Sequence, residues 1–388
     1  MAGARRGIGE CTVRKRADGR WEGRYKDVVT NKKKSVYAKT QKEVLAILKE
    51  KMIEYNIGSN KAFATLDMKN WVKVWLEKYN VHIKPLTRLS YERITNTHII
   101  PQIGDKLLIE LTMPDLQDMY ERLLNGRGLN PKTIKNVHGV IHKCLDKARV
   151  LGYIQKNVAD DVVLPRTKKP QIVPIEENIV PLFVEEAMKD KYADIFIVTM
   201  FTGMRQGEVL GLSWRDIDFA KGTITINNQL QKISKKGGGY FLASTKNDKE
   251  RIIAPADIVI DVLKKRQKEQ NEDKRKAGRL WEAKGEFADL VFTHETGKHF
   301  AHGTVYKHCK RILNNIGLPE SRFHDLRHSY AVISLQNGDD IKTVQENLGH
   351  HSAAFTLDTY AHMTNKMRYE SAKRMNDFVE QMQHQSVS

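Results

Sequence analysis

Residues 202–214 read Thr-Gly-Met-Arg-Gln-Gly-Glu-Val-Leu-Gly-Leu-Ser-Trp and follow an apolar run at 195–200. The pattern predicts an apolar helix that ends at Gly203 and a second helix that begins at Arg205. Glu208 lies three residues after Arg205, on the same helical face, where its carboxylate can hold the guanidinium. An arginine held in this way suits phosphate binding, because its planar donors are already oriented. The alternative is an ion pair that only stabilises the helix.

A lysine lies between two short runs that have the character of strands. Residues 240–242 and 251–253 are the runs, and Asn247-Asp248 has turn chemistry. The pattern predicts a hairpin with Lys246 near its tip, where a flexible ammonium can donate a proton to a scissile bond. Taken alone, Lys246 is much better explained as one solvated lysine among many.

Two further motifs bring histidine, arginine and tyrosine together near the C-terminus. His324 and Arg327 are three residues apart, so a helix would point both the same way, towards one phosphate. The sequence Leu-Gly-His at 348–350 can end a helix at its glycine and bring His350 close to a ligand. Tyr360 follows ten residues later. A tyrosine in such a setting more often packs in a core than acts as a nucleophile.

The motifs have a fixed order along the chain: Arg205 with Glu208, Lys246, His324 with Arg327, His350, and Tyr360. Each is weak alone, but the ordered set resembles the tyrosine recombinase (phage integrase) family, strongly in the C-terminal part and loosely before it. The resemblance implies a site-specific recombinase that integrates and excises a mobile element. It is most similar to the integrases of conjugative transposons and temperate phages.

The resemblance also implies the chemistry of each residue. Tyr360 would be the nucleophile and would form a 3′-phosphotyrosyl bond with DNA. Lys246 would protonate the leaving 5′ oxygen, and His324 would position groups or accept the tyrosine proton. Where many relatives have paired threonines before the tyrosine, this chain has Phe355-Thr356. That departure concerns the local helix contacts and not the tyrosine.

The remaining residues of the set would bind the phosphate. Arg205 and Arg327, assisted by His350, would bind the non-bridging oxygens, and Glu208 would support Arg205. Fixed cations can stabilise the developing charge without a metal, and the phosphotyrosyl bond conserves the energy needed for rejoining. The sequence has no P-loop pattern and no acidic cluster typical of two-metal nucleases. We therefore expect an enzyme that needs no cofactor, metal or ATP.

Two other functions use the same residues. A type IB topoisomerase has a similar catalytic set, although a separate basic N-terminal module and a helical middle domain favour a recombinase. A DNA-binding regulator with a decayed catalytic set is the alternative from a different class. All six catalytic positions hold reactive residue types, which argues against decay.

The length of 388 residues predicts a multidomain protein, mainly α-helical. Residues 1–60 are expected to form a three-stranded sheet with one helix, and residues 65–165 an all-helical domain. Residues 171–388 are expected to form a mixed, mostly helical catalytic domain with a small antiparallel sheet and a C-terminal tail helix. Linkers are expected at 57–60 and 165–170, the second because two prolines bracket a basic run.

The first segment is strongly basic, with 15 Lys and Arg against 7 Asp and Glu in residues 1–60. Three strands and one helix, opened by Thr40 and Glu43 as a capping box, could place a sheet in a DNA groove. It resembles the arm-type DNA-binding domain of integrases. The alternative is a solvated basic module without groove contacts. The candidate DNA-binding residues are Arg14, Arg20, Trp21 and Arg24.

The middle segment resembles the core-binding, SAM-like domain of the same family. Its apolar residues have helical spacing; Pro101 is expected to end one helix, and Pro114 and Pro131 to begin two others. A solvated surface explains any one of its basic residues as well as a phosphate contact does. The candidate DNA-binding residues are Lys84, Arg88, Lys132 and Lys135.

Composition indicates the partner and the compartment. Lys and Arg number 65 against 47 Asp and Glu, a formal net charge of +18 that favours a polyanion. The expected partner is double-stranded DNA at element ends and target sites. Three distant cysteines fit a reducing cytoplasm, and no run has the apolar length of a membrane span or signal peptide. We expect a bacterial, cytoplasmic, nucleoid-associated protein without a membrane partner.

Two regions remain for other roles. One loop region gathers His294, His299, His302, His308 and Cys309, but this spacing fits no zinc pattern well, and we expect no metal there. Residues 363–388 read as a polar loop and a helix with a broken apolar stripe. The resemblance implies that such a tail docks on a neighbouring copy in a dimer or tetramer on DNA. It also allows an excisionase-type accessory protein.

Overall fold

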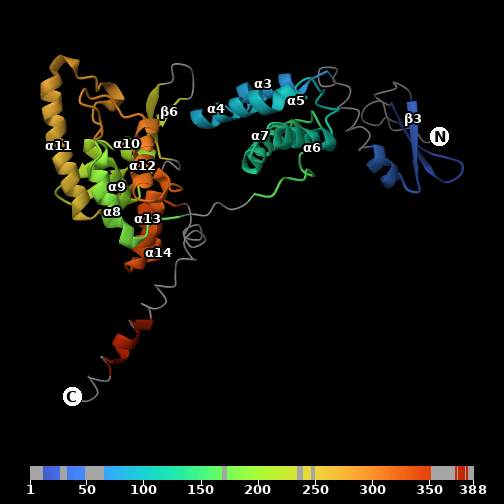
Figure 1. Cartoon of the computed structure of the whole chain (residues 1–388). Helices are drawn as coiled ribbons and strands as arrows, with labels where there is room; N and C mark the ends of the chain where they lie inside the picture. The colour runs from blue at the N-terminus through green and yellow to red at the C-terminus, as the bar shows by residue number, and fades with distance from the viewer. Residues whose placement is uncertain are drawn as a thin grey trace. The chain divides into compact units, whose positions relative to one another are not determined.

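The computed structural model describes residues 12–26, 33–48, 65–167, 173–233, 239–245 and 250–350, and in the tail residues 372–373, 375–380 and 382. The chain divides into two compact units, residues 1–169 and 170–388. The described residues are mainly helical with small antiparallel sheets, as predicted (Figure 1). No helix among them is both long enough and apolar enough to cross a lipid bilayer.

The N-terminal module is a three-stranded antiparallel sheet with one helix on it. Its strands, in spatial order, are β1 (Thr12–Lys15), β2 (Trp21–Lys26) and β3 (Lys33–Ala38). The predicted capping box is confirmed: the Glu43 N–H donates to Thr40 Oγ1 and the Thr40 N–H donates to Glu43 Oε2. Gly23 of β2 lies against this helix, because a Cβ there would meet Val44 and Leu48 at 2.6–2.8 Å. One face of the sheet is therefore covered.

The helical domain packs its helices around a core that includes the buried Trp71 and Ile134. Pro114 and Pro131 stand in the first turns of α6 and α7, as predicted. The helices are α3 (Met68–Lys78), α4 (Pro85–Ile94), α5 (Ile100–Ile103), α6 (Met113–Glu121) and α7 (Pro131–Val150), with π-helical segments η1 (Thr95–Ile99) and η2 (Arg122–Gly126).

The prediction that Pro101 ends a helix is wrong. The chain stays helical from α4 through the π-helical turn η1 into α5, and Pro101 stands in the first turn of α5. A π-turn shifts the hydrogen-bond pattern by one residue: the Ile100 N–H donates to the Thr95 carbonyl. Proline is tolerated directly after such a shift, because a first-turn residue needs no N–H partner.

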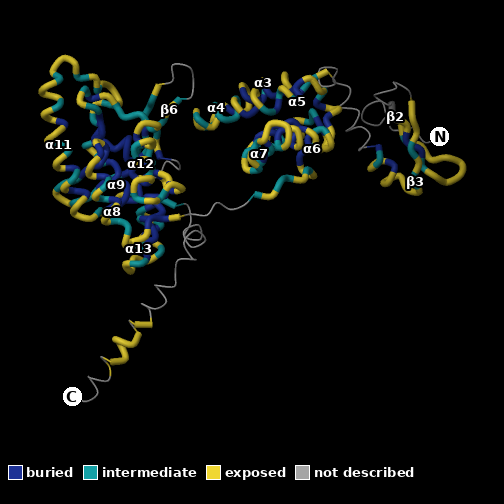
Figure 2. The backbone as a smooth tube through the Cα atoms, viewed as in Figure 1, coloured by how far each residue is buried: buried dark blue, intermediate teal, exposed yellow. Residues whose placement is uncertain are grey.

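The C-terminal unit is built around α9, whose residues are buried except for the half-buried Asp194 and Phe201 (Figure 2). Among its described residues, seven helices form most of it: α8 (Val180–Met188), α9 (Ala193–Thr202), α10 (Gln206–Leu210), α11 (Asp257–Ala277), α12 (His302–Asn315), α13 (Phe323–Gln336) and α14 (Ile341–Leu348). Its strands are β4 (Ile217–Asp218), β5 (Thr223–Ile226), β6 (Asn228–Lys232), β7 (Tyr240–Ser244) and β8 (Arg251–Ile253).

The predicted hairpin of 240–242 with 251–253 is wrong. Strand β7 pairs with β6, whereas β8 pairs with β5 in a different sheet. Strand β6, which the sequence analysis did not identify, takes the place of the expected partner. The segment that contains Lys246 therefore connects two sheets instead of closing one hairpin.

The described part of the C-terminal tail is helical and carries exposed apolar side chains. Their spacing of three and four residues gives one apolar stripe. They are Met375, Phe378, Val379 and Met382.

Candidate active site

The turn between α9 and α10 places Arg205. Gly203 ends α9 in the left-handed conformation, with φ of 65°. A Cβ at this position would lie 2.6 Å from side-chain atoms of Leu348 and Tyr330, so the close approach of α13 and α14 also requires glycine. Arg205 then caps α10, as predicted.

Glu208 holds Arg205 in the predicted way. The Arg205 Nη1 donates to Glu208 Oε1 at 2.6 Å, and the Arg205 backbone N–H donates to Oε2 at 2.9 Å. Glu208 is only 2% exposed. Its burial opposes ionisation, but the hydrogen bonds and charges of Arg251 and Arg205 outweigh that effect and lower its pKa to about 2. The carboxylate is therefore ionised at neutral pH.

Arg327 is buried at the meeting point of two helix ends. It is 1% exposed, and its Nη1 donates to the Gly203 carbonyl at 2.7 Å while its Nη2 donates to the Leu348 carbonyl. These carbonyls belong to the C-terminal ends of α9 and α14, where a helix favours a positive charge. Arg327 thus joins the segment that carries Arg205 to the segment that carries His350.

The turn after α14 completes the cluster. Gly349 caps α14 in the left-handed conformation, and its carbonyl accepts from Arg205 Nη2 at 3.4 Å. His350 follows directly, and desolvation together with the charges of Arg327 and Arg205 lowers its pKa to about 3. The structure therefore brings Arg205, Arg327 and His350 together at one site.

His324 borders the same site from the first turn of α13. Its side chain is exposed, and its ring meets the ring of His328 edge-on, with centroids 4.9 Å apart. Partial desolvation, then the charges of His328 and Arg327, lower the pKa of His324 to about 4. His324 is thus neutral at neutral pH, the state in which an imidazole can accept a proton.

Lys246 and Tyr360 lie outside the described residues, as do Phe355 and Thr356. Their predicted roles stay predictions. Of the six predicted catalytic residues, the other four share one site.

Two members of this cluster, Arg251 and His328, were not predicted from the sequence. Arg251 donates to Glu208 from both terminal nitrogens, and its side chain is 10% exposed. The available signal was a charged residue at the start of the apolar strand Arg-Ile-Ile. His328 is buried, one turn after His324 on α13.

The basic candidates of the N-terminal module divide between its two sheet faces. Side chains alternate along a strand, so Arg14 and Arg24 share the face opposite the helix, whereas Trp21 shares the covered face with Gly23. Trp21 is therefore a weaker candidate for DNA contact than the arginines. Arg20 is exposed and pairs with Asp18 at 2.9 Å.

A buried acid organises the open face, which the sequence analysis did not foresee. Glu22 is 3% exposed and accepts from Arg14 Nε at 2.6 Å, from Arg24 Nε at 3.0 Å and from Ser35 Oγ at 3.1 Å. The hydrogen bonds from Arg14 and Arg24 lower its pKa to about 2. Both guanidiniums are thereby held in place on this face.

The basic candidates of the helical domain lie at the starts of α4 and α7. Lys84 and Lys132 are exposed; Arg88 is half-buried and pairs with Glu92 at 3.1 Å. Lys135 is half-buried, and its ammonium donates to Thr167 Oγ1 at 3.3 Å.

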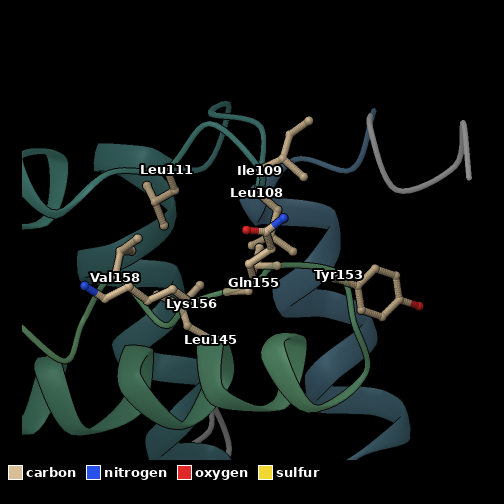
Figure 3. Close-up of a pocket in the computed structure, with 9 residues that line it drawn as sticks. Leu108, Ile109, Leu111, Leu145, Tyr153, Gln155, Lys156 and Val158 are labelled. Carbon is tan, nitrogen blue, oxygen red and sulfur yellow. The ribbon is translucent and has the colours of Figure 1, made fainter. Parts of the chain in front are cut away.

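The helical domain also has an apolar pocket of about 280 Å³ (Figure 3). Its lining offers no cluster of titratable groups for catalysis, since Lys156 and Tyr153 are its only ionisable side chains. The lining residues are Leu108, Ile109, Leu111, Leu145, Tyr153, Ile154, Gln155, Lys156 and Val158.

The histidine-rich loop gives no metal site within the part of the chain that the structure describes, where no three His, Cys, Asp or Glu side chains gather closely enough to hold an ion. His299 and His302 instead lie beside Tyr240, with ring centroids 4.4 and 5.6 Å away. His308 Nδ1 donates to the Asp190 carboxylate at 2.7 Å.

Comparison with known proteins decides the family. The profile described as "Phage integrase family" matches residues 167–367, which is more than half of the chain and includes the whole cluster. The profile described as "Phage integrase, N-terminal SAM-like domain" matches residues 68–124. The chain belongs to the phage integrase family. It is a tyrosine recombinase, an enzyme of DNA strand exchange.

Comparison with individual relatives supports the same family. The recombinase is 30% identical to the tyrosine recombinase XerC-like protein of Caldanaerobacter subterraneus subsp. tengcongensis, over 89% of this chain and 92% of that protein. It is 23% identical to the ICEBs1 integrase of Bacillus subtilis, over 88% and 91% of the two chains. Solved structures show the same fold. The Tn1549 transposon integrase matches with a TM-score of 0.67 and 20% sequence identity, over 80% of this chain and 99% of that one. Lambda integrase matches with a TM-score of 0.55 and 16% sequence identity, over 88% of this chain and 96% of that one.

Acidification should destabilise the recombinase, and His350 should cause part of the loss. The pKa of His350 is about 3 when folded against 6.5 ordinarily, so between these values only the unfolded chain binds the proton. This contribution is complete above about pH 6.5 and is lost as the pH falls. We expect the free energy of unfolding, measured with urea, to fall between about pH 7 and pH 4 by roughly 1–3 kcal/mol more in the wild type than in His350→Gln. Equal losses would contradict a desolvated, neutral His350.

Proposed function

We propose that this recombinase integrates and excises a mobile element by cutting and rejoining DNA through a 3′-phosphotyrosyl bond to Tyr360. The observation that carries the proposal is the junction at 348–350. There, Arg327 is bound to the Leu348 carbonyl, Arg205 to the Gly349 carbonyl, and His350 follows. Two arginines from other helices and His350 are thereby brought to one turn, and all three are suited to bind one phosphate.

The proposed roles follow from the chemistry of each group. Arg205 and Arg327 bind the non-bridging oxygens, because guanidiniums offer parallel donors to an oxyanion. His350, neutral in the free protein, donates a hydrogen bond to the same phosphate. Fixed donors in a desolvated site stabilise the charge that develops on the phosphate without reorganising during the reaction.

Proton transfer falls to residues at the rim of the site. His324 is exposed and neutral, so it can position or accept the proton of Tyr360. Lys246 donates a proton to the leaving 5′ oxygen. The described residues that flank its segment are Thr245 and Glu250. Arg251, directly after Glu250, contacts Glu208 within the site, which supports this role.

We assign DNA contacts to three domains: residues 1–60 as the arm-type domain, 65–165 as the core-binding domain and 171–388 as the catalytic domain. In the first, the open sheet face with Arg14 and Arg24 is the proposed contact. In the second, Lys84, Arg88, Lys132 and Lys135 at the starts of α4 and α7 are the proposed phosphate contacts. The net charge of +18 supports a long DNA footprint.

The relatives support DNA as the partner and a multimeric complex. The Tn1549 integrase was solved in complex with a circular intermediate DNA, and lambda integrase as a tetramer bound to a Holliday junction. By analogy, this recombinase acts as a dimer or tetramer on element ends in the bacterial cytoplasm. An excisionase-type protein would bias the direction.

The tail is the proposed link between copies, since its exposed stripe includes Met375, Phe378 and Val379. A chain truncated after Ala361 should still bind a single site within a few-fold, but should assemble and recombine at least about tenfold less well. Band-shift assays on one-site and two-site DNA, with a recombination assay, separate the two effects. Met375→Ser/Phe378→Ser in the full chain is the matched variant. Normal assembly and exchange by the truncated chain would refute the proposed link.

A nicked DNA substrate from the element ends tests the proposed function, because loss of the short fragment beyond the nick traps the covalent complex. Trapping only on these sequences supports a recombinase. Relaxation of plasmids without such sites would indicate a topoisomerase. DNA binding without a trapped covalent complex would indicate a decayed regulator.

A further inference from the structure

Arg251 contacts two parts of the candidate active site, although none of the predicted roles involves it. It opens β8, five residues after Lys246. Its Nη2 donates to Glu208 Oε2 at 2.6 Å and its Nη1 to Oε1 at 3.3 Å. Its Nε donates to the Asn347 carbonyl at 2.7 Å, near the end of α14. One side chain thus joins the support of Arg205 to the turn that carries His350.

The arrangement has an electrostatic consequence. Glu208 is ionised and 2% exposed, and its two oxygens are shared by Arg205 and Arg251. Without Arg251, the full charge of Glu208 would be balanced by Arg205 alone. A buried carboxylate next to Arg205 would then repel an approaching phosphate, and weak screening in the interior makes that repulsion strong.

The packing at Gly349 has a second consequence. A Cβ at Gly349 would lie 3.2 Å from Arg251 Cδ and Nη1, so Arg251 lies directly against this turn. The Gly349 carbonyl also accepts from Arg205 Nη2 at 3.4 Å. Arg251 therefore limits where the turn and His350 can move relative to Arg205.

We propose that Arg251 is a positioning residue for strand exchange: it neutralises Glu208, which leaves the positive charge of Arg205 available to the phosphate, and it fixes the Gly349–His350 turn. The inference rests on the proposed phosphate-binding roles of Arg205 and His350.

Two measurements on the full-length chain test the inference. One is the rise in melting temperature on adding inorganic sulfate, which reports anion binding without catalysis. The other is the single-turnover rate of cleavage of nicked DNA, measured together with DNA affinity. Arg251→Met should reduce the sulfate-induced rise and slow cleavage by about 10–100-fold, with DNA affinity changed only a few-fold. Arg251→Lys keeps the charge but not both contacts to Glu208, so its cleavage rate and sulfate response should lie between those of the wild type and Arg251→Met.

The double variant Glu208→Gln/Arg251→Met separates charge from packing. An uncharged amide can still accept the Arg205 backbone N–H, and it no longer competes for the positive charge of Arg205. We expect the double variant to cleave at least about tenfold faster than Arg251→Met and to regain part of the sulfate-induced rise in melting temperature. A purely structural arginine would give additive losses instead.

Arg266→Met is the matched control. Arg266 lies on α11, its side chain is 13% exposed, and it donates to the Thr293 carbonyl at 2.8 Å and pairs with Asp273 at 3.7 Å. Its removal should lower the melting temperature without changing the sulfate effect or the cleavage rate.

The outcomes separate the inference from the proposed function. Full sulfate response and cleavage in Arg251→Met, or no recovery in the double variant, would overturn the inference. If the wild type forms no covalent complex but the sulfate pattern holds, the proposed function fails while the role of Arg251 in anion binding stands.

Discussion

Arg327→Lys should lower the single-turnover rate of DNA cleavage by about 10²–10³-fold while DNA affinity changes only a few-fold. Lysine keeps the positive charge, so the variant tests geometry. The guanidinium of Arg327 binds the Gly203 and Leu348 carbonyls from separate nitrogens. The three donors of an ammonium are all on one atom, so lysine cannot reproduce contacts from two nitrogens and also present a planar fork of donors to a phosphate. Rapid-quench measurements on nicked DNA give the rate.

Arg266→Lys is the control for this substitution, since it makes the same exchange at a half-buried arginine away from the cluster. It should cleave within a few-fold of the wild type. If Arg327→Lys also retains nearly full activity, Arg327 binds the helix ends but does not contact the phosphate.

Tyr360→Phe should eliminate the covalent DNA complex altogether, because only the phenol oxygen can form the ester bond. DNA affinity and the melting temperature should be almost unchanged, since one hydroxyl is lost from a large interface. Denaturing gels of nicked, labelled DNA detect the complex with high sensitivity. Tyr306→Phe, at an exposed position on α12, should form the complex as the wild type does. A covalent complex formed by Tyr360→Phe would show that another residue is the nucleophile.

Local spacing was sufficient to predict much of the site. The Gly203 turn, the Arg205–Glu208 pair and the helix with His324 and Arg327 all depend on contacts between residues three or four apart. The N-terminal capping box at Thr40 is equally local. Such contacts are set by helix geometry and by the conformational freedom of glycine, both of which are visible in the sequence.

Contacts between distant segments were not predictable in the same way. Arg251 is 43 residues from Glu208 in the sequence, and the partner of β8 is β5 instead of the neighbouring β7. A strand pattern indicates that a strand forms but not which edge it joins. Pro101 shows the same limit at shorter range, because the π-turn before it has no clear signature in the sequence.

Glu22 illustrates a further limit. The N-terminal charges can be counted in the sequence, but the count does not reveal that one acid lies buried between Arg14 and Arg24. Strand register decides that arrangement, since Arg14 pairs directly with Glu22 across β1 and β2.

The most direct test is to identify the residue that becomes attached to DNA. Trapped complex from nicked element-end DNA is digested with nuclease and trypsin, and the modified peptide is sequenced by mass spectrometry. We expect a nucleotide 3′-phosphate on the oxygen of Tyr360. In Arg327→Lys we expect less of this adduct, roughly in proportion to the lower cleavage rate. Attachment to a different residue, or cleavage without any attached peptide, would contradict this expectation.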